Sequence, residues 1–193
     1  MLNIGVIVFK KVEEMDFIGP FEILSYANKI KENSVKIFLV AESKGPVRVF
    51  NGLTFLPDYD FATCPQLDIV IVPGGKGRFI AMHDDIMKSF LIQQSKNAKY
   101  ITSVCTGAFI LAEAGLLAGK KATTYHTALP ELAHYANIEV QQKKIVHDGT
   151  VITAAGVTSG IELGFYLLKL LFDSDTAKQA AEAVEYIVDL DSL

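Results

Sequence analysis

Short runs of Val, Ile and Phe alternate along the chain with longer stretches whose apolar residues recur every three or four positions. A short apolar run is typical of a buried strand, whereas the three-to-four spacing is typical of one helix face. The runs predict strands over residues 2–9, 35–41, 68–72, 100–104, 145–146 and 151–153. The longer stretches predict helices over residues 16–27, 85–95, 106–117, 128–135, 159–172 and 175–187. Such alternation predicts an α/β fold around a largely parallel sheet.

Turn residues separate these predicted elements. Asn51-Gly52 interrupts residues 47–56 and predicts a hairpin with a tight turn. Pro73-Gly74-Gly75 ends the strand predicted over residues 68–72. No internal repeat, low-complexity tract or Pro/Ser-rich linker divides the 193 residues, so we expect a single domain over residues 1–193.

Composition and charge narrow the classes of function. With 50% hydrophobic residues, the chain is not globally disordered. The net charge of −4 disfavours a nucleic-acid partner, because such partners are usually bound through a basic surface. The apolar stretch over residues 161–172 is too short to span a bilayer and contains Glu162 and Lys169, so no membrane partner is expected. The N-terminus has no basic region or small-residue cleavage site, which favours a cytoplasmic location.

The chain has two cysteines, Cys64 and Cys105, which we expect to be free thiols in a reducing compartment. Cys105 lies where a predicted strand turns directly into a predicted helix, and the small residue Gly107 follows two positions later. This arrangement resembles a nucleophile elbow, and a helix N-terminus favours thiolate over thiol. We therefore predict a reactive thiol of lowered pKa at Cys105, with a buried structural cysteine as the alternative. Cys64 has no accompanying motif and is interpreted as structural or incidental.

Two further segments follow predicted strands, at the sheet edge where α/β proteins bind ligands. Gly74 and Gly75 can expose backbone N–H groups and, with the N–H of Thr106, form an oxyanion hole; the alternative is a simple turn. Asp16 lies between the first predicted strand and the first predicted helix, at the start of that helix, and has two interpretations: a helix N-cap, or a general acid kept protonated by a neighbouring thiolate. Spacing alone does not choose between them.

Five segments together resemble the ThiJ/PfpI superfamily over essentially the whole chain. They are Asp16-Phe17-Ile18-Gly19-Pro20 with the following Phe21 to Leu24, Ile71-Val72-Pro73-Gly74-Gly75, Val104-Cys105-Thr106-Gly107-Ala108, Ala114-Gly115-Leu116-Leu117-Ala118 with the following Gly119 to Thr124, and Thr153-Ala154-Ala155-Gly156-Val157 with the following Thr158 to Glu162. The resemblance implies a flavodoxin-like three-layer sandwich with a largely parallel central sheet, related to class I glutamine amidotransferases. It also implies a homodimer.

Within the superfamily, the pairing of Asp-x-x-Gly-Pro with Cys-Thr-Gly is similar to the isonitrile hydratase branch. The pairing also occurs in amidotransferase-like domains of AraC-type regulators, which continue into a DNA-binding region. Because this chain ends at Leu193, we expect a stand-alone enzyme instead. The resemblance implies Cys105 as nucleophile, Asp16 as its carboxyl partner and Thr106 as the residue beside it. The glycine loop is implied as Gly74 and Gly75, with Gly75 favoured as the N–H donor.

The chain departs from the superfamily pattern at two positions. Protease-like members carry a His directly after the nucleophile, where this chain has Thr106, which disfavours a protease. Many relatives have a His after Ala-Thr-Thr, but here Tyr125 takes that place and His126 follows one residue later. Tyr125 and His126 stay candidates for substrate binding, with ordinary polar roles as the alternative. No Cys/His cluster has metal-ligand spacing, so no metal is expected.

The resemblance favours an isonitrile hydratase-like lyase that acts on a small-molecule substrate without a cofactor. In this hypothesis the Cys105 thiolate attacks the isonitrile carbon, protonated Asp16 supplies a proton, and water opens the thioimidate to an N-substituted formamide. One alternative is a glyoxalase- or deglycase-like enzyme that attacks reactive aldehydes. Another is a redox or electrophile sensor, or a ligand-binding module, in which Cys105 is the sensing group.

Overall fold

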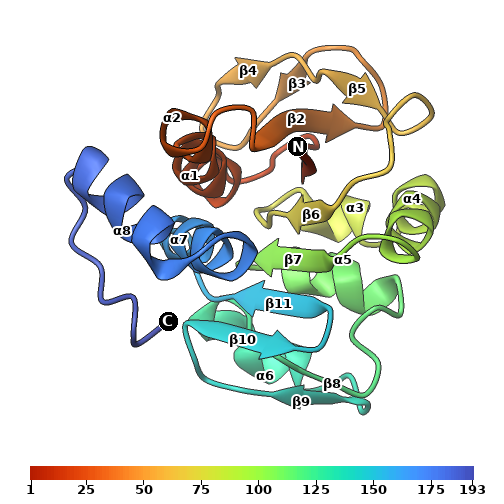
Figure 1. Ribbon diagram of the computed structural model, residues 1–193. Coiled ribbons are helices and arrows are strands. Elements are labelled where there is room, and N and C mark those ends of the chain that lie inside the picture. The colour runs from red at the N-terminus through yellow and green to blue at the C-terminus, as the bar shows by residue number, and fades with distance from the viewer.

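The computed structural model describes residues 1–193 and is built around one seven-stranded sheet (Figure 1). The strand order is β10-β11-β7-β6-β1-β2-β5, and every neighbouring pair is parallel except β10 with β11. The strands are β1 (Leu2–Ile7), β2 (Val35–Ala41), β5 (Tyr59–Asp60), β6 (Ile69–Val72), β7 (Tyr100–Val104), β10 (Ile145–Asp148) and β11 (Val151–Ala154). The predicted α/β class with a largely parallel sheet is confirmed.

Helices cover both faces of the sheet, which gives the three layers of a flavodoxin-like fold (Figure 1). On one face lie α1 (Glu14–Ser25), α2 (Ala27–Ile30), α7 (Ser159–Leu171) and α8 (Ser174–Ala183). On the other lie α3 (Arg78–Ala81), α4 (Asp85–Ser95), α5 (Gly107–Glu113) and α6 (Leu129–Leu132). Because successive strand side chains alternate, Ile69 and Ile71 enter one core while Val70 and Val72 enter the other. This is why the apolar run of β6 is continuous.

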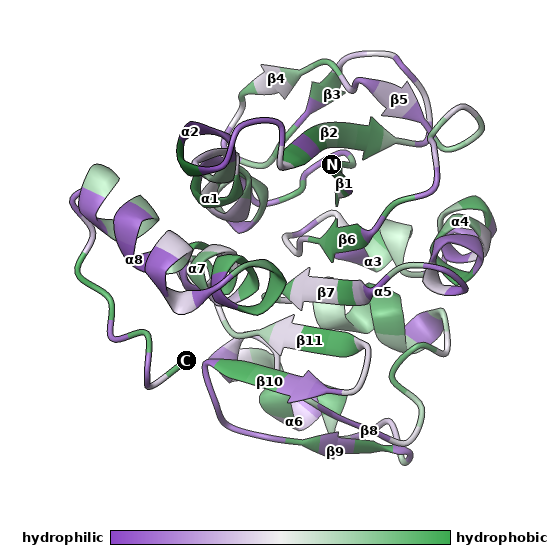
Figure 2. Ribbon diagram, in the orientation of Figure 1, coloured by the Kyte–Doolittle hydropathy of each residue, from purple (hydrophilic) through white to green (hydrophobic).

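Smaller elements surround this framework. The strands β3 (Val47–Arg48) and β4 (Thr54–Phe55) form the predicted hairpin, in which Gly52 has a φ of +107°. Beyond the sheet, β8 (Lys120–Ala122) pairs with β9 (Ile138–Val140), and the 3-10 helix η1 (His126–Ala128) precedes α6. Figure 2 shows β1, β2 and β6 as mostly hydrophobic and α8 as largely hydrophilic. None of the helices is both long and apolar enough to cross a membrane.

Three predicted helices have the wrong extent. The helix predicted over residues 106–117 ends at Glu113, because Gly115 adopts a φ of +73° in the left-handed region that closes a helix. The segment predicted as one helix over residues 128–135 is instead the end of η1 followed by the single turn of α6. The last predicted helix, residues 175–187, ends at Ala183, since Glu185 has a φ of +54° and turns the chain away.

Candidate active site at the carboxyl ends of the parallel strands

Cys105 occupies the tight turn between β7 and α5. Its φ of +56° lies in the left-handed region that non-glycine residues rarely adopt. The turn is held on two sides: the Cys105 N–H donates to the carbonyl oxygens of Ala154 (3.1 Å) and Ala155 (2.6 Å), and the Thr124 hydroxyl donates to the Cys105 carbonyl (2.8 Å). The surrounding structure thus fixes a strained conformation at the residue that the sequence selects as nucleophile.

Small residues allow the loop after β6 to approach this turn closely. A Cβ atom on Gly74 would lie only 2.5 Å from the backbone nitrogen of Thr106, and one on Gly107 would overlap the Val72 carbonyl oxygen. The Gly75 N–H then reaches the Thr106 hydroxyl at 3.0 Å. The structure therefore brings Gly74, Gly75 and Thr106 together beside Cys105.

Asp16 is fully buried in the first turn of α1 and faces this turn. It is not the N-cap, a position that Glu13 occupies. The Gly74 N–H donates to its Oδ2 (3.0 Å), while Oδ1 has no conventional hydrogen-bond partner. The pKa of Asp16 is raised from 3.8 to about 7, mainly by burial. The Gly74 N–H lowers it, the charge of Glu13 raises it and the Cys105 thiol lowers it, and together these effects leave the pKa at about 7. Asp16 can therefore hold a proton near neutral pH.

The predicted lowering of the Cys105 pKa is wrong. Burial, and after it the charge of Asp16, raise the pKa of the Cys105 thiol to about 12. The N–H groups of Thr106 and Val157 and the Thr106 hydroxyl favour the thiolate, as expected near a helix N-terminus, but they are outweighed. Between about pH 7 and 12 the pair of Cys105 and Asp16 thus carries one negative charge and one proton. Transfer of that proton to Asp16 would leave the thiolate.

The backbone donors are arranged differently from the oxyanion hole that the sequence suggests. The N–H groups of Gly74 and Gly75 are already bonded to Asp16 and to the Thr106 hydroxyl. The N–H groups that act on the sulfur are those of Thr106 and Val157. Val157, with a φ of +23°, was missed by sequence reasoning, because nothing in the residue type indicates where its N–H points.

Tyr125 borders the site, whereas His126 is exposed to solvent beside it. The half-buried ring of Tyr125 lies against Gly156, where an added Cβ would be 2.5 Å from it, so Tyr125 borders the loop that carries Val157. His126 is exposed, its ring 4.5 Å from that of Tyr125 between centroids, and it makes no hydrogen bond to Cys105 or Asp16. The imidazole is thus not placed as the partner of the thiol.

Comparison with known proteins agrees with this architecture. The sequence profile of the DJ-1/PfpI family matches residues 3–170. The chain belongs to the DJ-1/PfpI family. It is 38% identical to an isonitrile hydratase from Pseudomonas putida over 188 residues, which are 96% of this chain and 78% of that protein. It is 22% identical to a deglycase from Pyrococcus horikoshii over 144 residues, 72% of this chain and 82% of that protein.

A solved structure shows the same fold within the DJ-1/PfpI family. The crystal structure of a ThiJ/PfpI family protein from Pseudomonas syringae superposes with a TM-score of 0.90 at 35% sequence identity. The match covers 97% of this chain and 76% of that one. The expected relation to the ThiJ/PfpI superfamily is therefore confirmed.

Other features of this DJ-1/PfpI family member lie apart from the site. Cys64 is half-buried with its Sγ 3.4 Å from the Pro65 carbonyl oxygen, and burial raises its pKa to about 11.

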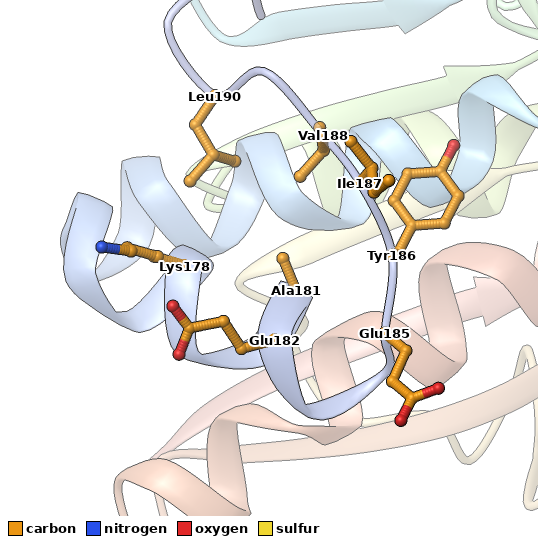
Figure 3. A pocket seen from close by; sticks show the side chains of 8 residues that line it. All are labelled: Lys178, Ala181, Glu182, Glu185, Tyr186, Ile187, Val188 and Leu190. Carbon is orange, nitrogen blue, oxygen red and sulfur yellow. The ribbon is translucent and has the colours of Figure 1, made fainter.

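A surface groove of about 420 Å³ lies between α8 and the C-terminal segment (Figure 3), and another of about 490 Å³ lies between α1 and the end of α8. Neither groove is lined by Cys105 or Asp16. No group of three or more His, Cys, Asp or Glu side chains is arranged to hold a metal ion.

Proposed function

We propose that the protein is an isonitrile hydratase-like lyase in which Cys105 and Asp16 convert an organic isonitrile and water into an N-substituted formamide. One observation carries the proposal: a cysteine on a strained turn faces a buried carboxyl group, and above about pH 7 the two side chains together carry one proton and one negative charge. The 38% identity to an isonitrile hydratase supports the choice of electrophile. The oxygen of the product comes from water, and the reaction involves no net oxidation or reduction.

In the first half of the reaction, the proton of Cys105 passes to Asp16 and the thiolate attacks the terminal isonitrile carbon. A carbon–sulfur bond forms, and the resulting negative charge on that carbon is removed when Asp16 returns the proton to it. The product of this half is a thioimidate, in which the former isonitrile carbon carries one hydrogen and is doubly bonded to nitrogen. The carboxylate of Asp16 is left beside it.

In the second half, the Asp16 carboxylate accepts a proton from water as its oxygen adds to the thioimidate carbon. The proton then goes to the substrate nitrogen, the carbon–sulfur bond breaks, and loss of the hydroxyl proton gives the formamide and regenerates the thiol. The N–H groups of Thr106 and Val157 stabilise the departing sulfur, because they favour its anionic form. A well-placed donor of this kind contributes ~2–4 kcal/mol in other enzymes.

The proposal is tested by measuring N-substituted formamide produced from a small aliphatic isonitrile by four proteins: wild type, Cys105→Ala, Asp16→Asn and Cys64→Ala. We expect turnover to be lost in Cys105→Ala, severely reduced in Asp16→Asn and unchanged in Cys64→Ala. The last variant is a matched control, since it removes the other free thiol, which lies outside the site. Formamide production by folded Cys105→Ala would refute the covalent mechanism.

A second candidate is aldehyde chemistry of the glyoxalase or deglycase type, favoured by the similarity to a deglycase. The same thiolate would attack an aldehyde carbon, with Asp16 protonating the new oxyanion. Lactate formation from methylglyoxal, dependent on Cys105, distinguishes this activity from isonitrile hydration. If neither product forms, selective peroxide oxidation of Cys105 over Cys64 would favour the sensor hypothesis.

We further propose that the protein is a cytoplasmic homodimer, as the superfamily resemblance implies. Sedimentation equilibrium tests the oligomeric state directly. A dimer is expected at twice the chain mass of 21.1 kDa, and a mass that stays at 21.1 kDa across the concentration range would contradict it.

A further inference from the structure

Glu13 is linked to the carboxyl group of Asp16 through a single residue of the glycine loop. Its backbone N–H donates to the Gly74 carbonyl oxygen (3.1 Å), and the Gly74 N–H donates to Asp16 Oδ2 (3.0 Å). A Cβ on Gly75 would overlap the Glu13 nitrogen, so the loop and the start of α1 pack with no space between them. These contacts fix the position of the Glu13 backbone, so that only Gly74 lies between it and the Asp16 carboxyl group.

The side chain of Glu13 is held by the turn of the β3–β4 hairpin. Asn51 Nδ2 donates to Glu13 Oε1 (3.1 Å) and also to Glu14 Oε2 (2.7 Å). The Asn51 N–H donates to Glu14 Oε1 (2.7 Å), so both oxygens of the buried Glu14 carboxylate are satisfied within the hairpin turn. The Glu13 carboxylate has only the one bond, and its charge is not neutralised by any cation of an ion pair.

We propose that Glu13, held by Asn51, is a positioning residue that keeps a second negative charge beside Asp16 and thereby helps Asp16 to retain its proton. The inference rests on the proposed function, because it assigns Glu13 a part in the proton transfers of that reaction. Glu13 does not contact the reacting atoms. It acts only through the charge that Asp16 experiences.

Among the groups around Asp16, Glu13 is the carboxylate whose charge disfavours ionisation of the Asp16 carboxyl group. At the start of α1, the N-cap residue Glu13 acts on the Asp16 carboxyl, while Glu14 is bonded by Asn51. From the β7–α5 turn the titratable group is the Cys105 thiol. The glycine loop presents a backbone N–H, and α7 presents the backbone of Gly160 near the Asp16 carbonyl. A like charge favours the neutral form of a carboxyl group, so Glu13 works in the same direction as burial.

The test is the titration of Asp16 followed by carboxyl ¹³C NMR in wild type, Glu13→Gln and Glu22→Gln, with the resonance assigned by its absence in Asp16→Asn. Glutamine at position 13 still accepts from Asn51, so the variant removes the charge and keeps the hydrogen bond. We expect its Asp16 midpoint to fall by about 0.5 to 1 pH unit. Glu22→Gln is the matched control, since Glu22 is an exposed carboxylate on the same helix. Its midpoint should equal that of wild type.

An Asp16 midpoint in Glu13→Gln that equals those of wild type and Glu22→Gln would overturn the proposal. The readout does not depend on turnover, so the two ideas fail separately. A lowered midpoint in a protein that hydrates no isonitrile would support the role of Glu13 while refuting the hydratase. In an active protein, the pH dependence of kcat should move to lower pH in Glu13→Gln by the same amount as the NMR midpoint.

Discussion

Replacing Asp16 by Asn should make the protein more stable at alkaline pH while it removes the proton carrier of the site. The carboxyl group is fully buried, and one of its oxygens has no conventional hydrogen-bond partner. Asparagine has the same shape and no charge. Its carbonyl oxygen can keep the bond from Gly74, and its amide group can face the sulfur of Cys105, which accepts weakly.

The magnitude follows from the pKa of Asp16, which burial raises from 3.8 to about 7. Below pH 3.8 the group is protonated in both folded and unfolded chains and contributes nothing. As the pH rises toward 7, the unfolded chain releases its proton while the folded chain keeps it, so the free energy of unfolding falls. Each unit of pKa difference corresponds to 1.36 kcal/mol, so the full loss is roughly 4 kcal/mol and stays constant above pH 7.

Urea unfolding at intervals between pH 4 and 8, in the presence of a reductant, measures this effect. The free energy of unfolding of Asp16→Asn minus that of wild type should increase by roughly 4 kcal/mol across this range. The same difference for the exposed Glu22→Gln should stay within about 0.5 kcal/mol throughout. A difference for Asp16→Asn that changes by less than about 1 kcal/mol would refute the conclusion that burial keeps Asp16 protonated near neutral pH.

Three further variants test the packing and the proton chemistry. Gly74→Ala places a Cβ 2.5 Å from the Thr106 backbone nitrogen and should cost ~1–3 kcal/mol in urea unfolding; an unchanged midpoint would contradict the close approach. Glu131→Ala removes the partner, at 2.6 Å, of the buried Arg78 guanidinium and should cost ~1–3 kcal/mol in the same assay, whereas a cost below ~0.5 kcal/mol would show that the pair is not stabilising. His126→Gln should retain Cys105-dependent turnover within about threefold, and a hundredfold loss, about 2.7 kcal/mol, would place the imidazole in the reaction.

The elements that the sequence predicts well are those with a long, regular pattern. The helix predicted over residues 85–95 coincides with α4, whose Asp84 side chain caps it by accepting from the N–H groups of Ile86 and Met87. The strand predicted over residues 100–104 coincides with β7, whose β-branched residues Ile101, Thr102 and Val104 favour a strand. The short elements β8, β9 and α3 were missed, since three or four residues are too few to show a period.

The sequence by itself determined the fold class, the family resemblance and Cys105 as a cysteine between a strand and a helix, since each of these depends on local pattern. Only the tertiary structure decided that Asp16 faces Cys105 and that the Gly74 N–H is bonded to that carboxyl group. It also reversed the expected direction of the thiol pKa. The physical reason is that a pKa depends on burial and on charges brought together by folding, and residues 16 and 105 become neighbours only when the sheet and helices are assembled.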